Sequence, residues 1–456
     1  MNGEIPMKKR ALMALLLVMA LCLSSCALIV KDKEVDAKTV ILKLGDEEIT
    51  KAEVQNATNS MLYQQYQYYA MLGSDIDLSN PDVIASAQSS AITQLKNEMT
   101  LRAKAKELGL DVLTEEDNTK IKERAQSNWD ADKSLVQSSY LSEDEKKLEG
   151  EELDKAILAQ MEKMGLKMED YEEEAKESII NSKVRDYAIK DVTVSDEEVK
   201  ADYDSKVAAD EEKYKENASS WASADRSGTT LYYAPAGLRR VKQILIRFKS
   251  EDQTAISDAN TKVSDALTKV SDAQKVLDDE AASEEDKTKA QEALAAANAD
   301  LDAAQAELKT AVDAAFARLD EDADAVLAAL EANPDDWDKL QEEKNEDPGM
   351  KAGAVNAEKG YAVCENMSGF DSAFVNAAMA LENVGDVSGK IRGENNGYYI
   401  IKYVADVPEG SVDFESVKES LHSALLTSKQ NSTYTDTLAQ WVKDAGIKED
   451  LGALKD

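Results

Sequence analysis

Histidine is almost absent from this chain, whose 456 residues include one histidine, three cysteines, six prolines and five phenylalanines. His422 lies in a segment with helical periodicity, and no other histidine exists to form a cluster with it. Zinc hydrolases, Ser-His-Asp enzymes and Cys-His enzymes need such clusters, so these classes are excluded and we expect no metal and no cofactor. Only Cys26 and Cys364 follow residue 25, so no disulfide framework is expected.

Positive charge is also scarce. The chain has 54 Lys and Arg residues and 90 Asp and Glu residues, which gives a formal net charge of −36 at pH 7. Nucleic-acid binding requires clustered Lys and Arg side chains at phosphates, so we expect no nucleic-acid partner. The same charge disfavours broad adsorption on anionic lipid. High net charge is instead typical of a protein that stays soluble.

Long apolar runs are missing except near the N-terminus. A basic segment at Lys8, Lys9 and Arg10 precedes an apolar run at 11–23, and Leu23-Ser24-Ser25-Cys26 follows. This order predicts a lipoprotein signal peptide over 1–25, lipidation of Cys26 and a tether over 26–39. We therefore expect an extracytoplasmic protein anchored to the cell membrane. The alternative is an ordinary secretory signal with an incidental cysteine.

The rest of the chain has mainly helical periodicity. Residues 40–47 alternate like a strand, and Thr50 with Glu53 forms a capping box that starts a nearly continuous helical region reaching about residue 192. Residues 61–72 hold four tyrosines and two methionines, which suits either a surface for diverse apolar sequences or a helix packed on its own domain. Ser195 and Glu198 predict the cap of another helix.

Residues 250–315 differ from their surroundings. The sequence Val-Ser-Asp-Ala starts at residue 263 and again at residue 270, seven residues later. Two further series repeat every seven residues, the leucines 294, 301 and 308 and the alanines 290, 297, 304 and 311. This heptad of Leu and Ala predicts an antiparallel coiled-coil hairpin that turns near 279–286. The alternative is a single long helix that forms a dimer through the same seam.

A strand at 238–246 and the segments after the hairpin follow a recognisable order. A helix at 314–330 leads to Asp347-Pro348-Gly349, a Phe-containing helix at 370–381, Gly385-Asp-Val-Ser388, and a final strand at 398–404. Two amphipathic helices are expected over 413–445. The order resembles parvulin-type peptidyl-prolyl isomerase domains, and the helical arms resemble those of PrsA- and SurA-like extracytoplasmic foldases.

The resemblance implies which residues form the site. The two histidines of the parvulin family fall at Gln243 and Tyr399, while the family's Cys or Asp falls at Asp347. These three are the candidate catalytic residues, although both histidine positions are replaced. The family's substrate pocket implies four further positions, namely Phe370, Phe374, Leu381 and Ile400.

The resemblance also implies an α+β fold, with a mostly helical chaperone-like domain and a small parvulin-like antiparallel-sheet domain carrying the hairpin. Expected boundaries after the tether are an N-terminal domain (40–204), a linker (205–237), the parvulin-like domain (238–405, with the insertion at about 250–315) and C-terminal helices returning to the N-terminal domain (406–456). Implied partners are unfolded or proline-containing exported polypeptides.

Three functions stay open. The first is a foldase whose isomerase activity is weak or lost, because both histidines are replaced. The second is a holdase or peptide-binding module without turnover. The third is a structural coiled-coil surface lipoprotein.

Overall fold

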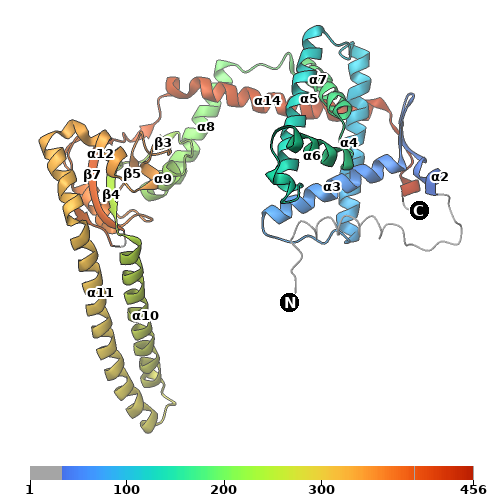
Figure 1. Ribbon diagram of the computed structural model, residues 1–456. Helices are drawn as coiled ribbons and strands as arrows, with labels where there is room; N and C mark the ends of the chain where they lie inside the picture. The colour runs from blue at the N-terminus through green and yellow to red at the C-terminus, as the bar shows by residue number, and fades with distance from the viewer. Residues whose placement is uncertain (1–32, 395, 455–456) are drawn as a thin grey trace. The chain divides into compact units, whose positions relative to one another are not determined.

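The computed structural model describes residues 33–394 and 396–454, which form two compact units (Figure 1). The first unit contains the residues up to Val194 and those from Ala424 onward, and the second runs from Ser195 to Ser423. Helices dominate both units and the sheets are small and antiparallel, which confirms the predicted α+β class. The expected signal peptide at 1–25 and Cys26 lie outside the described residues, as does the first part of the expected tether.

The first unit combines a small sheet with a set of helices. Strand β1 (Val40–Leu44) turns at Gly45 into β2 (Glu47–Thr50), and β9 (Lys448–Glu449) pairs with the other edge of β1. The capping box of Thr50 and Glu53 is present at the start of the first long helix, as predicted. The helices are α2 (Lys33–Ala37), α3 (Lys51–Met71), α4 (Pro81–Leu108), α5 (Glu115–Ser139), α6 (Gly150–Lys163) and α7 (Met168–Ile189).

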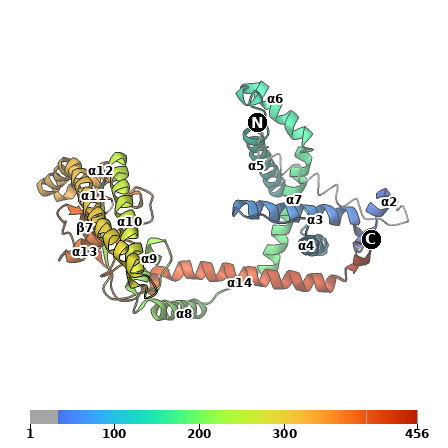
Figure 2. The same ribbon diagram turned by 90° about the horizontal axis from the view of Figure 1, so that it is seen from below.

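Helix α14 (Phe414–Ala445) is one continuous helix (Figure 2), whereas two helices were expected over 413–445. The reason is that no glycine or proline interrupts it. From Ala424 onward it belongs to the first unit, where Leu438 and Trp441 pack against the core around Val184. Its first part belongs to the second unit, so the whole segment does not return to the N-terminal helices as expected.

The second unit begins earlier than expected. Helix α8 (Asp196–Tyr214) belongs to it, not to the N-terminal domain, and the expected linker at 205–237 is largely structured. Helix α9 (Ala218–Arg226) lies in that segment, and its Trp221 is buried and donates a hydrogen bond to the Tyr233 carbonyl at 2.6 Å. The buried Trp221 indole holds this segment against the second unit. If the segment detached, the indole would lose its apolar contacts and its hydrogen bond.

A four-stranded antiparallel sheet forms the centre of the second unit, in the order β5-β4-β7-β6. One face packs on α9 and α13, and the other packs on α11 and α12. A separate strand pair joins β3 to β8. The elements are β3 (Tyr233–Ala234), β4 (Arg239–Arg247), β5 (Tyr361–Val363), β6 (Ile391–Arg392), β7 (Gly397–Asp406), β8 (Gly410–Ser411), α10 (Ser250–Asp278), α11 (Glu284–Ala332), α12 (Trp337–Lys344) and α13 (Ser372–Ala380).

Helices α10 and α11 form an antiparallel hairpin between β4 and α12, and not the single long helix of the alternative (Figure 1). Alanines fill its seam, with Ala259, Ala266 and Ala273 on α10 and Ala290, Ala297 and Ala304 on α11. The expected separate helix at 314–330 is the continuation of α11, since no glycine or proline breaks the chain. Phe316 and Leu319 of this continuation are buried against the sheet.

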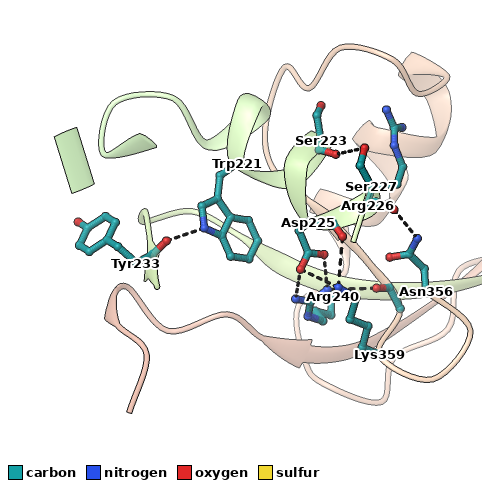
Figure 3. Close-up of polar contacts among 10 residues, drawn as sticks. Trp221, Ser223, Asp225, Arg226, Ser227, Tyr233, Arg240, Asn356 and Lys359 are labelled. Carbon is teal, nitrogen blue, oxygen red and sulfur yellow. Dashed lines mark hydrogen bonds and ion pairs between the residues drawn. The ribbon is translucent and has the colours of Figure 1, made fainter. Parts of the chain in front are cut away.

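A buried ion cluster ties α9 to the sheet (Figure 3). The Asp225 carboxylate, 6% exposed, accepts hydrogen bonds from both Arg240 Nη atoms at 2.8 and 2.9 Å and from Lys359 Nζ at 2.8 Å. Burial alone would raise the pKa of Asp225, but these two cations outweigh it and hold the pKa below its usual value. The cluster therefore stabilises the fold only while Asp225 is ionised.

Within the part of the chain that the structure describes, no helix is both long and apolar enough to cross a membrane.

We predict that Asp225→Asn lowers the free energy of unfolding by about 3 kcal/mol, because it leaves Arg240, whose side chain is only 17% exposed, without its counter-ion. The wild type should lose this advantage as the pH falls below about 4, since its folded pKa is depressed. Urea unfolding at several pH values measures both effects. Asp338→Asn is the matched control, because that carboxylate is 89% exposed and 3.9 Å from Lys242. Equal losses in both variants would contradict the prediction.

We predict that the outer part of the hairpin is dispensable for folding. Lys269 pairs with Asp300 at 2.9 Å, and Lys262 pairs with Glu307. Removing 264–277 and 292–305 therefore takes two heptads from each arm and keeps the register. Amide exchange in β4 and β7 should stay slow, because α11 still covers the sheet. Replacing the whole of 252–312 with a short linker should instead speed amide exchange in β4 and β7, because it removes Ile256 from the core. Fast exchange in the shorter deletion would refute this.

Candidate functional site

A pocket of about 400 Å³ opens on the face of the sheet that packs on α13. Strand β4 contributes alternate residues to it, and β5 and β7 contribute one tyrosine each. Helix α13 and the segments after α12, before α13 and before β7 complete the wall. The lining residues are Gln243, Leu245, Arg247, Asp347, Pro348, Tyr361, Gly369, Phe370, Asp371, Phe374, Asn396 and Tyr399.

The register of β4 and β7 determines which side chains share this face. Leu245 pairs with Tyr399 and Gln243 pairs with Ile401, and residues two apart point to the same side of a strand. Gln243 and Tyr399 are therefore diagonal neighbours on the same face of the sheet. A diagonal pair still lies close enough for long side chains to act on one ligand.

A turn at residues 345–347 closes one edge of the pocket. Strand β5 pairs only with Arg239–Val241, which leaves the edge of β4 free beyond that point. The turn fills this edge, because Asn345 Oδ1 accepts from the Leu245 N–H at 3.0 Å and the Leu245 carbonyl accepts from the Glu346 N–H at 2.9 Å. These bonds satisfy the free backbone groups and place Asp347 over the sheet.

Asp347 is the centre of the polar floor. Its Oδ2 accepts hydrogen bonds from Gln243 Nε2 at 2.7 Å and from the Tyr361 hydroxyl at 2.9 Å, and its Oδ1 accepts from the Gly349 N–H at 3.0 Å. A Cβ at Gly349 would lie 1.9 Å from the Tyr361 hydroxyl, so this tight arrangement requires glycine. Gln243 is 5% exposed, and its Oε1 has no hydrogen-bond partner. The floor thus keeps one unused acceptor.

Four aromatic rings form the apolar wall. Phe370 lies between Tyr361 and Phe374, with ring centroids 5.1 and 5.3 Å away, and Phe374 lies 5.4 Å from Tyr399. Arg226 covers the outer face of Phe370 at 4.6 Å from the ring centroid. Such a wall suits a compact apolar ring, because the faces of the four rings offer apolar contact area.

Both tyrosines of the pocket stay neutral at physiological pH. Burial raises the pKa of Tyr399 to about 12, even though a hydrogen bond from Asn396 at 2.8 Å favours the phenolate. The negative charges of Asp371 and Asp347 raise it further. Burial and the adjacent Asp347 likewise raise the pKa of Tyr361. Each phenol can therefore donate a hydrogen bond but does not exchange protons near neutral pH.

The structure brings five of the candidate residues together in this pocket, namely Gln243, Tyr399, Asp347, Phe370 and Phe374.

Two other expected residues lie elsewhere. Ile400 is on the opposite face of the sheet, in the core with Phe316, because it alternates with Tyr399 along β7. Leu381 caps the end of α13, where its carbonyl accepts from Arg239 at 2.6 Å, and it does not line the pocket. Neither residue can contact a ligand in this pocket.

Sequence reasoning missed Tyr361, Arg247 and Asn396. Alternation along β4 could have identified Arg247, since it follows Gln243 and Leu245 on the same face. Tyr361 and Asn396 have no local signal, because their roles depend on the approach of separate segments. No group of three or more His, Cys, Asp or Glu side chains suited to a metal ion occurs within 33–394 and 396–454.

Comparison with known proteins gives a partial match. No family model matches the chain. The foldase protein PrsA of Clostridium botulinum (strain Hall) is 30% identical over 138 residues, which cover 30% of this chain and 39% of that protein. The foldase protein PrsA of Clostridium perfringens is 27% identical over 203 residues, covering 44% of this chain and 52% of that protein. This chain is related to the PrsA foldases.

The match confirms the resemblance inferred from the sequence motifs, but it is limited in extent. The chain spans about two fifths of the length of the first of these relatives. A crystal structure of the foldase protein PrsA from Streptococcus pneumoniae is 13% identical, with a TM-score of 0.25, and the match covers 91% of this chain and 97% of that one.

We predict that Tyr399→Phe loses stability relative to the wild type below about pH 10, and that the difference shrinks as the pH rises toward 12. The pKa of Tyr399 is higher in the folded protein than in the unfolded chain. Its contribution to stability is therefore fully present at a pH below the pKa of the unfolded chain, and it is lost as the pH rises through the pKa of the folded protein. Urea unfolding across this range measures the difference. Tyr63→Phe, at a 44% exposed tyrosine, controls for loss of a hydroxyl. A difference that stays constant with pH would contradict the prediction.

Proposed function

We propose that this protein is a membrane-anchored extracytoplasmic folding factor that binds proline-containing segments of unfolded exported polypeptides. The single observation that carries the proposal is the pocket, where an aromatic wall and a hydrogen-bonding floor meet on one face of the sheet. Kinship with the PrsA foldases supports the same substrate class. The anchor at Cys26 follows from the sequence motif alone.

The pocket suits a prolyl ring and its preceding carbonyl. Isomerisation breaks no covalent bond, but it must lower a rotational barrier of roughly 20 kcal/mol by binding the twisted amide better than either planar form. Phe370 and Phe374 would hold the ring. Tyr399 would offer its hydroxyl to the carbonyl, since this phenol remains protonated.

The same groups explain why isomerase activity should be weak. Gln243 Nε2 already donates one of its two N–H groups to Asp347, and its Oε1 is an acceptor, which cannot stabilise a carbonyl oxygen. Tyr361 also donates to Asp347. The donors left for the substrate are Tyr399, Arg247 at the rim and the second N–H of Gln243, and none of them is an imidazole. The Tyr399 ring is also larger than imidazole and occupies part of the pocket. We infer slow turnover with retained binding.

A second candidate function, a holdase without turnover, is favoured by the surface of α3. Large apolar side chains are exposed near its end, with Tyr68 at 56%, Met71 at 77% and Leu72 at 57% exposure. Single exposed apolar residues need no explanation, but a group of Tyr, Met and Leu is suited to contacts with varied unfolded chains. Such binding requires no action by the pocket.

A proline-peptide isomerisation assay on the full chain tests the proposal. We expect turnover about a hundred-fold below that of a parvulin with both histidines, because loss of one positioned donor costs on that order. The rate should not vary between about pH 5 and 8, since no histidine lines the pocket within the described residues and Tyr399 does not ionise there. Gln243→His combined with Tyr399→His should raise turnover.

The two candidates give different results in paired assays. For the foldase, the double histidine variant gains turnover and Phe370→Ala loses it. For the holdase, the full chain prevents aggregation of an unfolded protein, and Tyr68→Ser with Met71→Ser weakens this while the isomerisation rate stays unchanged. A rate equal to that of an intact parvulin would contradict our assignment of weak activity. Failure in both assays would refute both functions.

A further inference from the structure

A second hollow of about 300 Å³ adjoins the aromatic pocket at the base of the helical hairpin. Its lining consists of Gln253, Ile256, Ser257 and Asn260 from the first turns of α10, together with Arg247. Arg247 lines the aromatic pocket as well. The two hollows therefore share one side chain, at the point where β4 leads into the hairpin.

Arg247 has unused hydrogen-bonding capacity at this junction. Its Nε is buried and has no hydrogen-bond partner, and its guanidinium forms no ion pair with any residue in 33–394 or 396–454. Its backbone N–H donates to Glu346 Oε2 at 2.7 Å, so that carboxylate does not occupy the guanidinium. A buried N–H donor without a partner costs free energy, which a ligand that supplies an acceptor would recover.

The base of α10 is held firmly, so the second hollow does not depend on a loose loop. Asp252 is 1% exposed and accepts a hydrogen bond from Arg318 Nε on α11 at 3.1 Å. Gln253 Nε2 donates to the Phe248 carbonyl at 2.8 Å, and Ile256 is buried in the core beneath the sheet. A site built on regular elements keeps its geometry before the ligand arrives.

The chemistry of the lining is that of a site for polypeptide backbone. Arg247 offers donors, Gln253 retains its Oε1 acceptor, and Ser257 and Asn260 carry groups of both kinds. Each residue of an extended peptide presents both one N–H and one carbonyl, so it can use donors and acceptors together. Arg247 is the only charged residue in the lining.

We propose that the base of the hairpin is a second peptide subsite, which binds residues flanking the proline of a bound polypeptide. Arg247 donates to a backbone carbonyl where the peptide passes from one hollow to the other. This inference rests on the proposed peptide binding in the aromatic pocket. In this arrangement α10 contacts residues beyond the proline, so the protein binds long unfolded segments more tightly than short peptides. The hairpin thereby has a role in substrate recognition.

The test measures binding of two fluorescent proline peptides to the full chain by anisotropy, one of about four residues and one of about twelve. Ser257→Trp fills the second hollow, and we expect it to weaken binding of the long peptide about ten-fold while the short peptide is unaffected. Ser264→Trp is the matched control, because it lies one heptad further along the exposed face of α10. It should change neither affinity.

Two further variants separate the outcomes. Arg247→Met keeps the aliphatic stem and removes the donors, so it should weaken the long peptide more than the short one, and it provides a test even if Ser257→Trp fails to fold. Phe370→Ala should weaken both peptides equally. If the wild type binds neither peptide, the proposed function fails and the subsite fails with it. If both peptides bind and Phe370→Ala weakens both, but Arg247→Met and Ser257→Trp match the control, only the subsite is refuted.

Discussion

The pairing of β4 with β7 is the constraint on which the second unit depends. These two strands are paired along the whole of β4, from Arg239 opposite Asp406 to Arg247 opposite Gly397. The last pair is close enough that a Cβ at Gly397 would lie 2.0 Å from the Ile246 carbonyl oxygen, so this position needs glycine. Because side chains alternate between faces, the register assigns each residue either to the pocket or to the opposite core.

The helical hairpin is an integral part of this arrangement. It follows β4 directly, and the second half of α11 covers the face of the sheet opposite the pocket. Phe316 there packs against Phe248 and Tyr398, with ring centroids 4.8 Å from each. Packing of α11 on this face holds the strands in register, and the register sets which side chains line the pocket. The outer turns of the hairpin do not contribute to this packing, because their alanine seam lies between the two arms.

The floor of the pocket is built around a carboxylate. Asp347 accepts three hydrogen bonds there, and the two tyrosines beside it, Tyr361 and Tyr399, are neutral near pH 7. The phenols keep their protons near neutral pH, and Arg247 adds a charged donor to the lining. The hydrogen-bonding groups of the pocket are therefore shared between a carboxylate, two phenols, an amide and a guanidinium.

Sequence alone determined the features that depend on neighbouring residues. The capping boxes at Thr50 and Ser195 form where they were predicted, because a cap needs only residues within one turn. The alanine heptads mark the seam between α10 and α11 for the same reason. Five of the seven predicted site positions also meet in one pocket, since they come from an ordered set of motifs.

Tertiary structure decided what depends on contacts between distant segments. It placed Ile400 on the opposite face from Tyr399, assigned α8 to the second unit and brought Tyr361 to Asp347. It also left Arg247 between two hollows without a partner for its Nε. The sequence carries no local signal for these outcomes, because each one follows from which surfaces are buried against each other, and burial is settled only when the whole unit packs.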